Sequence, residues 1–174
     1  MEYSYLVKKV VFQISIIPVV KLMAASFTHI FFVMFMLVVY FCYGYQPDIY
    51  LIQLIYFSFC LFMFVLALSY VTCSIFIFFR DLMQIVNILL QIGMWATPIL
   101  WNIAYLDGEP ALQAILKCNP IFYIVNGYRN AMFAKTWFWQ DMPATLYFWI
   151  VTIVFFAFGM FLFRRLKGHF ADVL

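Results

Sequence analysis

Long runs of apolar residues, separated by short polar turns, dominate the chain. The first run covers residues 22–43 and holds 22 residues. As a helix it would be about 33 Å long at roughly 1.5 Å per residue, which matches one crossing of a bilayer. Pro18 and Lys21 precede the run, and the turn at residues 44–48 contains Gly and Pro. Because Gly and Pro interrupt helices, these flanks are expected to mark the ends of a transmembrane helix.

Three further runs have the same character. Residues 50–79 form a stretch of 30 residues without a charge, longer than the roughly 20 that a crossing needs, so this helix must tilt, bend or project beyond the lipid. The run at residues 82–101 is interrupted by Pro98, and the last run, 146–163, is followed directly by a basic tail. The hydropathy pattern therefore predicts four transmembrane helices, at residues 22–43, 50–79, 82–101 and 146–163.

Residues 111–134 are ambiguous, because 24 residues can cross a bilayer, yet Asn119 and Pro120 divide them into two shorter pieces. A crossing here would put the basic tail on the side opposite Lys8 and Lys9, against the positive-inside tendency. Without it, seven basic residues lie inside and three outside, namely Lys8, Lys9, Lys21, Arg80, Arg164, Arg165 and Lys167 against Lys117, Arg129 and Lys135. The charges favour a pair of short helices that enters the outer leaflet and returns.

Composition supports a membrane protein and excludes several other classes. The chain of 174 residues is 68% hydrophobic and only 10% charged, whereas globular domains are roughly half apolar and a quarter charged. The net charge of +3 is spread between the apolar runs, so nucleic acid is not an expected partner. The spacing of the four cysteines fits neither a metal site nor a disulfide framework. No signal peptide is recognisable before the first run.

No set of residues resembles a catalytic centre, so we do not expect an enzyme. His29 lies inside the first predicted crossing, where an ionisable group can mark a functional site. The alternative is a neutral imidazole that hydrogen-bonds to the backbone or to Ser26. No phosphate-binding loop of the GxxxxGK[ST] type occurs, so any nucleotide energy must come from another subunit.

Two other groups of residues have both a functional and a structural interpretation. Arg80 and Asp81 join the second and third predicted crossings, where they can cap helix ends or form a cytoplasmic gate. In the outer segment, tyrosine rings and a guanidinium suit the binding of sugars and phosphates, although interfacial anchoring is an alternative. The candidate residues of this outer exit or substrate path are Asn119, Pro120, Tyr123, Tyr128 and Arg129.

Four stretches of the chain are similar to a known family. They are LVKKVVFQISIIP, IFFRDLMQIVNILLQIGMWATPILW, KCNPIFYIVNGYRNAMF and FRRLKGHFADVL, at residues 6–18, 77–101, 117–133 and 163–174. Together they resemble the ABC-2 type permeases, and most of all the group that exports teichoic acids and related polysaccharides. Gln13 departs from the family pattern, which commonly has Pro at this place. The resemblance covers nearly the whole chain.

The resemblance implies an all-α polytopic membrane protein of the plasma membrane, with four transmembrane helices, a short re-entrant helix pair and both ends of this chain in the cytoplasm. Family members have six helices, so we expect an N-terminally truncated permease that lacks the first two. Residues 3–18 would be a cytoplasmic coupling segment, in which Lys8, Lys9 and Phe12 contact an ATPase. Residues 164–174 would be a cytoplasmic tail.

The resemblance also implies a function. Two copies of the permease would pair with two copies of a separate ABC ATPase and export a lipid-linked polymer, with teichoic acid as the expected cargo. The permease itself would need no cofactor, because ATP binds to the partner subunit. The alternatives are export of an O-antigen or capsule, export of a drug or lipid by the same fold, and a membrane scaffold that transports nothing.

Overall fold

The computed structural model describes residues 2–76, 79, 81–99, 101, 103–106 and 108–166, with the backbone alone for residues 2–15, 17, 104 and 106. Throughout these ranges the chain forms helices joined by short turns, without a strand. This confirms the all-α prediction. It is the expected outcome for an apolar chain, because a helix satisfies its own backbone hydrogen bonds in lipid.

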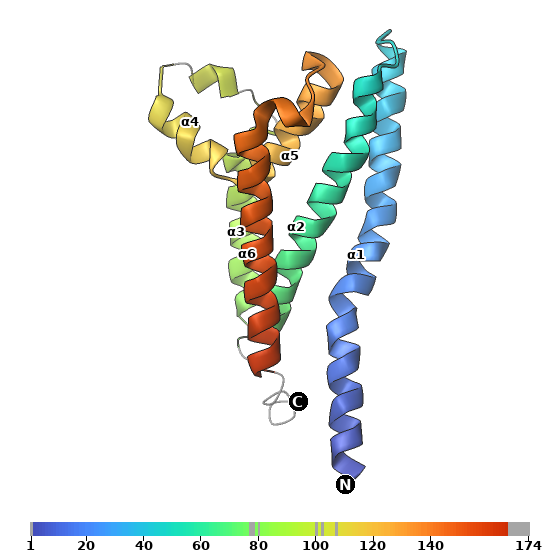
Figure 1. Cartoon of the computed structure of the whole chain (residues 1–174), viewed down its shortest axis with the longest axis vertical. Helices are drawn as coiled ribbons and strands as arrows, with labels where there is room; N and C mark the ends of the chain where they lie inside the picture. The colour runs from blue at the N-terminus through green and yellow to red at the C-terminus, as the bar shows by residue number, and fades with distance from the viewer. Residues whose placement is uncertain are drawn as a thin grey trace.

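The first helix, α1, runs without interruption over Glu2–Cys42 and is 41 residues long. The predicted coupling segment, 3–18, and the first predicted crossing, 22–43, are therefore parts of one helix. Pro18 lies inside it. A proline removes one backbone hydrogen bond and kinks a helix, and α1 is visibly bent in Figure 1.

Helices α2 (Gln53–Phe76) and α6 (Met142–Leu166) form the centre of the molecule. Three small residues of α2, each seven positions from the next, are completely buried: Cys60, Ala67 and Ser74. On α6, a Cβ added to Gly159 would lie only 3.0 Å from the backbone nitrogen of Val71. Small side chains thus let two backbones approach closely, which is the usual basis of helix association in membranes.

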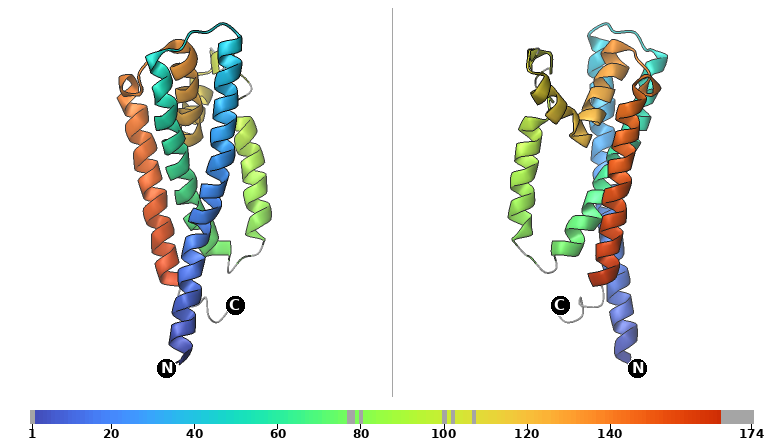
Figure 2. Two further views of the ribbon diagram at one scale, coloured as in Figure 1. Left: turned by 90° about the vertical axis from the view of Figure 1, so that its right-hand side faces the viewer. Right: turned by 60° about the vertical axis from the view of Figure 1, so that its left-hand side comes forward.

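Helix α3 (Leu82–Ala96) has 15 residues, so it is about 22 Å long. It ends five residues before the predicted boundary at 101, because Thr97 has an extended backbone in front of Pro98. None of its residues is buried. Figure 2 shows α3 standing to one side of the bundle formed by α1, α2 and α6.

Three helical segments are long and apolar enough to cross a membrane, namely Pro18–Cys42, Ile49–Phe76 and Phe138–Leu166. They include most of the first, second and fourth predicted crossings. The second begins with the 3₁₀ turn η1 (Ile49–Ile52). The fourth, predicted at 146–163, is longer at both ends. Helix α3 is a shorter apolar helix, and its assignment as a crossing stays a prediction.

The segment between α3 and α6 folds into a helix pair. The 3₁₀ turn η2 (Ile103–Leu106) leads to α4 (Pro110–Lys117), which is followed by α5 (Pro120–Arg129). A π-helical turn, η3 (Asn130–Ala134), and a 3₁₀ turn, η4 (Phe138–Asp141), connect α5 to α6. In Figure 1, α4 descends towards the middle of the molecule and α5 rises again, so the pair returns to the end opposite both termini.

Candidate functional site

The turn between α4 and α5 is fixed by Asn119 and Pro120. Asn119 is the N-cap of α5, and its Oδ1 accepts a hydrogen bond of 3.0 Å from the backbone N–H of Ile121. Pro120 occupies the first helical position, where a missing N–H costs nothing. The Nδ2 of Asn119 donates to Oγ1 of the buried Thr97 at 2.8 Å. This contact ties the tip of the helix pair to the end of α3.

Tyr123 anchors α5 to the central helices. Its hydroxyl lies 2.9 Å from Oγ1 of Thr145 on α6 and 3.4 Å from the hydroxyl of Tyr56 on α2. Its ring stacks on that of Phe148, with 5.0 Å between the ring centroids. The predicted substrate residue therefore has a complete set of structural contacts.

Tyr128 joins three helices. Its hydroxyl is 2.6 Å from Oγ of Ser58 on α2 and 3.2 Å from Nε2 of His29 on α1. Ser26, which was one expected partner of the imidazole, instead donates to the carbonyl oxygen of Leu22 at 2.9 Å. His29 also lines an apolar cavity of about 510 Å³ between α1 and α2. The histidine is thus a link in the packing of α1, α2 and α5.

Arg129 holds the segment that follows α3. Its Nη2 donates to the carbonyl oxygens of Ile99, at 2.8 Å, and Trp101, at 3.0 Å. These carbonyls lie beyond the last turn of α3 and have no helical partner. Tyr128 and Arg129 also border an apolar cavity of 410 Å³ between α1 and α5. Together, the predicted outer residues hold the helix pair against α1, α2, α3 and α6.

Of the remaining predicted site residues, Lys8, Lys9, Phe12 and Asp81 lie at the opposite end of the molecule. Lys8, Lys9 and Phe12 belong to the first turns of α1, and their side chains are outside the described residues. Asp81 is the N-cap of α3, but its side chain makes no capping hydrogen bond. Arg80 also lies outside the described residues.

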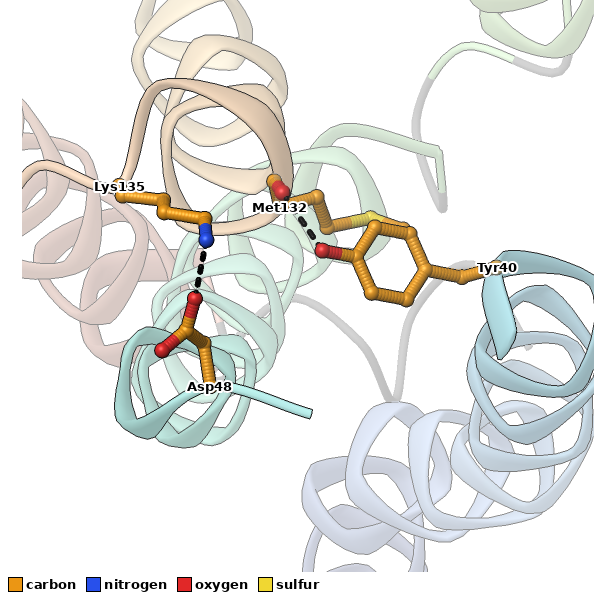
Figure 3. Close-up of polar contacts among 4 residues, drawn as sticks. All are labelled: Tyr40, Asp48, Met132 and Lys135. Atoms are coloured by element: carbon orange, nitrogen blue, oxygen red, sulfur yellow. Dashed lines mark hydrogen bonds and ion pairs between the residues drawn. The ribbon is translucent and has the colours of Figure 1, made fainter. Parts of the chain in front are cut away.

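Two polar contacts at the outer end were not predicted from the sequence (Figure 3). The hydroxyl of Tyr40, near the end of α1, donates to the carbonyl oxygen of Met132 at 3.0 Å. The ammonium of Lys135 forms an ion pair with Asp48 in the turn between α1 and α2. The hydrogen bond to Asp48 raises the pKa of Lys135 above its ordinary value. We call these two contacts the outer clamp.

Gln53, a polar residue inside the second predicted crossing, is a structural residue. It is almost completely buried, its Nε2 donates to the carbonyl oxygen of Thr136 at 3.0 Å, and its Oε1 accepts from the backbone N–H of Phe138 at 2.8 Å. The amide of Gln53 therefore supplies hydrogen-bond partners to two backbone groups of the loop before α6. The available signal was a lone amide at the start of an otherwise apolar run.

A small polar cavity lies behind the helix pair, between α5 and the loop that leads into α6. Its volume is about 200 Å³, and its walls include Asn126, Asn130, Trp137 and Asp141. We call it the outer polar cavity. These residues were not predicted from the sequence, although the spacing of four between Asn126 and Asn130 places them on one helix face.

The described residues contain no group of three or more His, Cys, Asp and Glu side chains that could hold a metal ion. The candidate site is a helix pair that polar and aromatic contacts hold at one end of an apolar bundle. Such an arrangement can shape or block a passage at that end.

Comparisons with known proteins agree with this architecture. The ABC-2 type transporter family matches residues 5–133. Over 66 residues, or 38% of this chain and 25% of the relative, the chain is 36% identical to the O-antigen export system permease protein RfbA of Myxococcus xanthus. Two O-antigen export system permease proteins RfbA of Klebsiella pneumoniae are 27% and 26% identical over 98% of this chain.

The chain spans 64% of the length of each Klebsiella relative. No solved structure matches it. The family match extends from α1 through the helix pair and covers well over half of the chain, so this protein belongs to the ABC-2 type transporter family.

Proposed function

We propose that this chain forms the membrane-spanning permease part of an ABC exporter that moves a lipid-linked polysaccharide outward. The observation that carries this proposal is the similarity of 98% of the chain to permeases named for O-antigen export. A separate ABC ATPase supplies the energy, since the chain carries no phosphate-binding loop of its own.

The continuity of α1 supports a route by which the two ends communicate. One helix of 41 residues begins in the predicted coupling segment and ends next to the outer clamp. Along the way, His29 meets Tyr128 of α5 at 3.2 Å. A rigid-body shift of α1, driven by closure of the ATPase, therefore reaches the helix pair directly. In this mechanism the pair moves with α1 to open the outer passage.

The exposed surface of α3 supports a second copy of the permease as a partner. This helix is apolar and none of its residues is buried, with Ile85, Leu89 and Ile92 all more than half exposed. We propose that one face of α3 meets the second copy and that the passage runs between the two subunits. A polar polymer requires such a protein-lined route, because hydrocarbon cannot solvate it.

For the cargo, the names of the relatives favour an O-antigen type of polysaccharide. Teichoic acid, the cargo expected from the sequence, stays a prediction. Part of its support was the HFADVL motif at residues 169–174, which lies outside the described residues.

The test is to inactivate the gene in its own organism and to measure both surface polysaccharide and its lipid-linked precursor inside the cell. We expect the surface polymer to disappear and the precursor to accumulate, with recovery on complementation. Sugar and phosphate analysis of the precursor separates a neutral glycan from a teichoic acid. Unchanged surface polymer would refute the proposal. Purification of the native protein in mild detergent should also recover an ABC ATPase, and its absence would favour a scaffold.

A further inference from the structure

The outer polar cavity has the dimensions and lining of a binding site. Its volume of about 200 Å³ is below the roughly 300 Å³ at which cavities for drug-sized ligands begin, so it can take one small ring. It lies at the outer end of the molecule, with Gln140 and Asp141 exposed at its edge. The cavity is therefore accessible from the end to which the proposed function delivers the polymer.

The side-chain amides of Asn126 and Asn130 are unused by the fold. Both residues line the cavity and are half-buried, and their side chains make no hydrogen bond to any described residue. Each amide offers two donor hydrogens and one acceptor oxygen. Neighbouring hydroxyl groups, which both donate and accept, are the natural partners of such a pair. The carboxylate of Asp141 adds acceptors, because only its Oδ1 is engaged, in a long contact of 3.4 Å with the N–H of Ala144.

Aromatic rings form the apolar part of the cavity wall. Trp137 is held in place by a parallel stack on Trp139, with 4.4 Å between the centroids, and Phe138 is stacked on Tyr56 at 4.2 Å. Rigid aromatic walls suit a ring that has apolar C–H faces and a polar rim. A sugar has this combination of surfaces.

The charges around the cavity favour a neutral sugar over a phosphorylated one. Among the described lining residues, Asp141 is the one charged group. The two nearest basic residues along the chain are committed elsewhere, since Lys135 pairs with Asp48 and Arg129 donates to the carbonyl oxygens beyond α3. A phosphodiester would meet a carboxylate with no cation to offset the repulsion.

We propose that the outer polar cavity binds one neutral sugar residue, through the amides of Asn126 and Asn130 and the carboxylate of Asp141, against the wall formed by Trp137. The inference rests on the proposed function for the source of that sugar, the exported polysaccharide. It gives α5 and the loop before α6 a recognition role in addition to their structural contacts.

Saturation-transfer NMR on the purified native protein in lipid nanodiscs tests the inference without any transport assay. The probes are methyl α-glucopyranoside, methyl α-mannopyranoside and glycerol phosphate. We expect at least one of the glycosides to bind and glycerol phosphate not to bind. The double variant Asn126→Ala with Asn130→Ala should weaken glycoside binding by roughly tenfold or more, as hydroxyl groups lose their partners. The milder variant Gln140→Ala, at the exposed edge, should weaken it less.

The matched control is Asn87→Ala, an exposed asparagine that borders a different cavity between α2 and α3. It should bind the glycosides as the unaltered protein does. The inference is overturned if neither glycoside binds, if binding survives in the double variant while the fold is intact, or if glycerol phosphate binds at this site. Loss of the proposed function would appear separately, as normal surface polysaccharide in cells without the gene.

Discussion

At the scale of single residues, the side chains that looked suited to a ligand are occupied in holding the fold. Tyr123, Tyr128 and Arg129 each bond to groups on another helix or on the chain beyond α3. The sequence assigned them to an outer exit or substrate path, with interfacial anchoring as the alternative, and that role stays a prediction. Their hydrogen-bond partners in the fold are protein groups, because polar atoms of α5 that pack against an apolar bundle must be satisfied within the protein.

Replacing Gly127 with Ala should destabilise the protein. A Cβ at this position would lie 2.2 Å from Cε1 of Phe57, whose ring is almost completely buried and packed between other aromatic rings. We expect a loss of about 1–3 kcal/mol, typical of an overpacked core, and a lower midpoint of thermal unfolding in detergent. The matched control is Gly93→Ala on α3, where nothing lies within 4 Å. An equal effect of the two substitutions would contradict this packing argument.

Replacing Arg129 with Ala should release the segment after α3. The change leaves the carbonyl oxygens of Ile99 and Trp101 without their donor, and hydrogen bonds to charged groups contribute about 1.5–3 kcal/mol each. We expect reduced surface polysaccharide together with a lower unfolding midpoint, and partial recovery in Arg129→Lys, which can still donate. The control is Lys117→Ala, at an exposed position on α4. Wild-type export by Arg129→Ala would show that this contact is dispensable.

At the scale of elements, the close approach of α2 and α6 and the clamping of the loops decide how the helices fit together. The stripe of Cys60, Ala67 and Ser74 presents small side chains to the centre of the bundle. At the outer end, the clamp links the end of α1 and the turn after it to the segment after α5. The first of these features sets the distance between helices, and the second sets the position of the loops.

A large side chain at Gly159 should separate α6 from α2. The backbone nitrogen of Val71 and the Cβ of Tyr70 already lie 3.0 Å from where a Cβ would be, so Gly159→Leu has no room. We expect a loss of several kcal/mol, at or above the usual range for overpacking of about 1–3 kcal/mol, measured by thermal unfolding. Ala157→Leu, on the exposed side of the same helix, is the control and should be tolerated. Equal stability of the two variants would argue against close contact of α2 and α6.

The ion pair of the outer clamp should be sensitive to alkaline pH. The pKa of Lys135 is raised above its ordinary 10.5, mainly by the hydrogen bond to Asp48. The stabilising effect of the ion pair is therefore complete below the ordinary pKa of the lysine and is lost as the pH rises through the raised pKa. Limited proteolysis should cut the outer loops more readily in this alkaline range. At neutral pH, the outer loops of Asp48→Asn should be cut as readily as those of the unaltered protein are at alkaline pH. Adding Lys135→Met to this variant should not increase the cleavage further.

At the scale of the whole molecule, α1 connects the two ends. It carries the predicted coupling segment at one end and contacts α5 and the segment after it near the other. In the proposed mechanism, this one helix, which bends and contains Pro18, carries a displacement from the coupling segment to the outer end. Large apolar surfaces of α1 and α3 are exposed, and lipid or a second copy of the permease can cover them.

Charge reversal at the start of α1 should disrupt the proposed contact with the ATPase. We expect Lys8→Glu combined with Lys9→Glu to abolish co-purification of the ATPase and to stop export, while the permease itself still reaches the membrane. Lys117→Glu, a reversal on α4 at the other end of the molecule, should leave the complex intact. Undiminished recovery of the ATPase with the double variant would exclude this part of α1 as the coupling site.

The sequence by itself determined the class of the protein and the approximate place of its main helices. Hydropathy and length suffice for this, because lipid requires each crossing to be a long apolar helix that satisfies its own backbone. Asn119 and Pro120 likewise predicted the break between α4 and α5, since capping and the loss of an N–H act locally.

The tertiary structure alone decided which helices touch and through which atoms. The bonds from Tyr128 to His29 and Ser58 join residues 99 and 70 positions apart. The outer polar cavity likewise forms only when α5 meets the loop before α6. An apolar pattern shows that a face can be buried, but many pairings satisfy it equally well. The choice among them depends on close packing around residues such as Gly127 and Gly159, and on the pairing of every buried polar group.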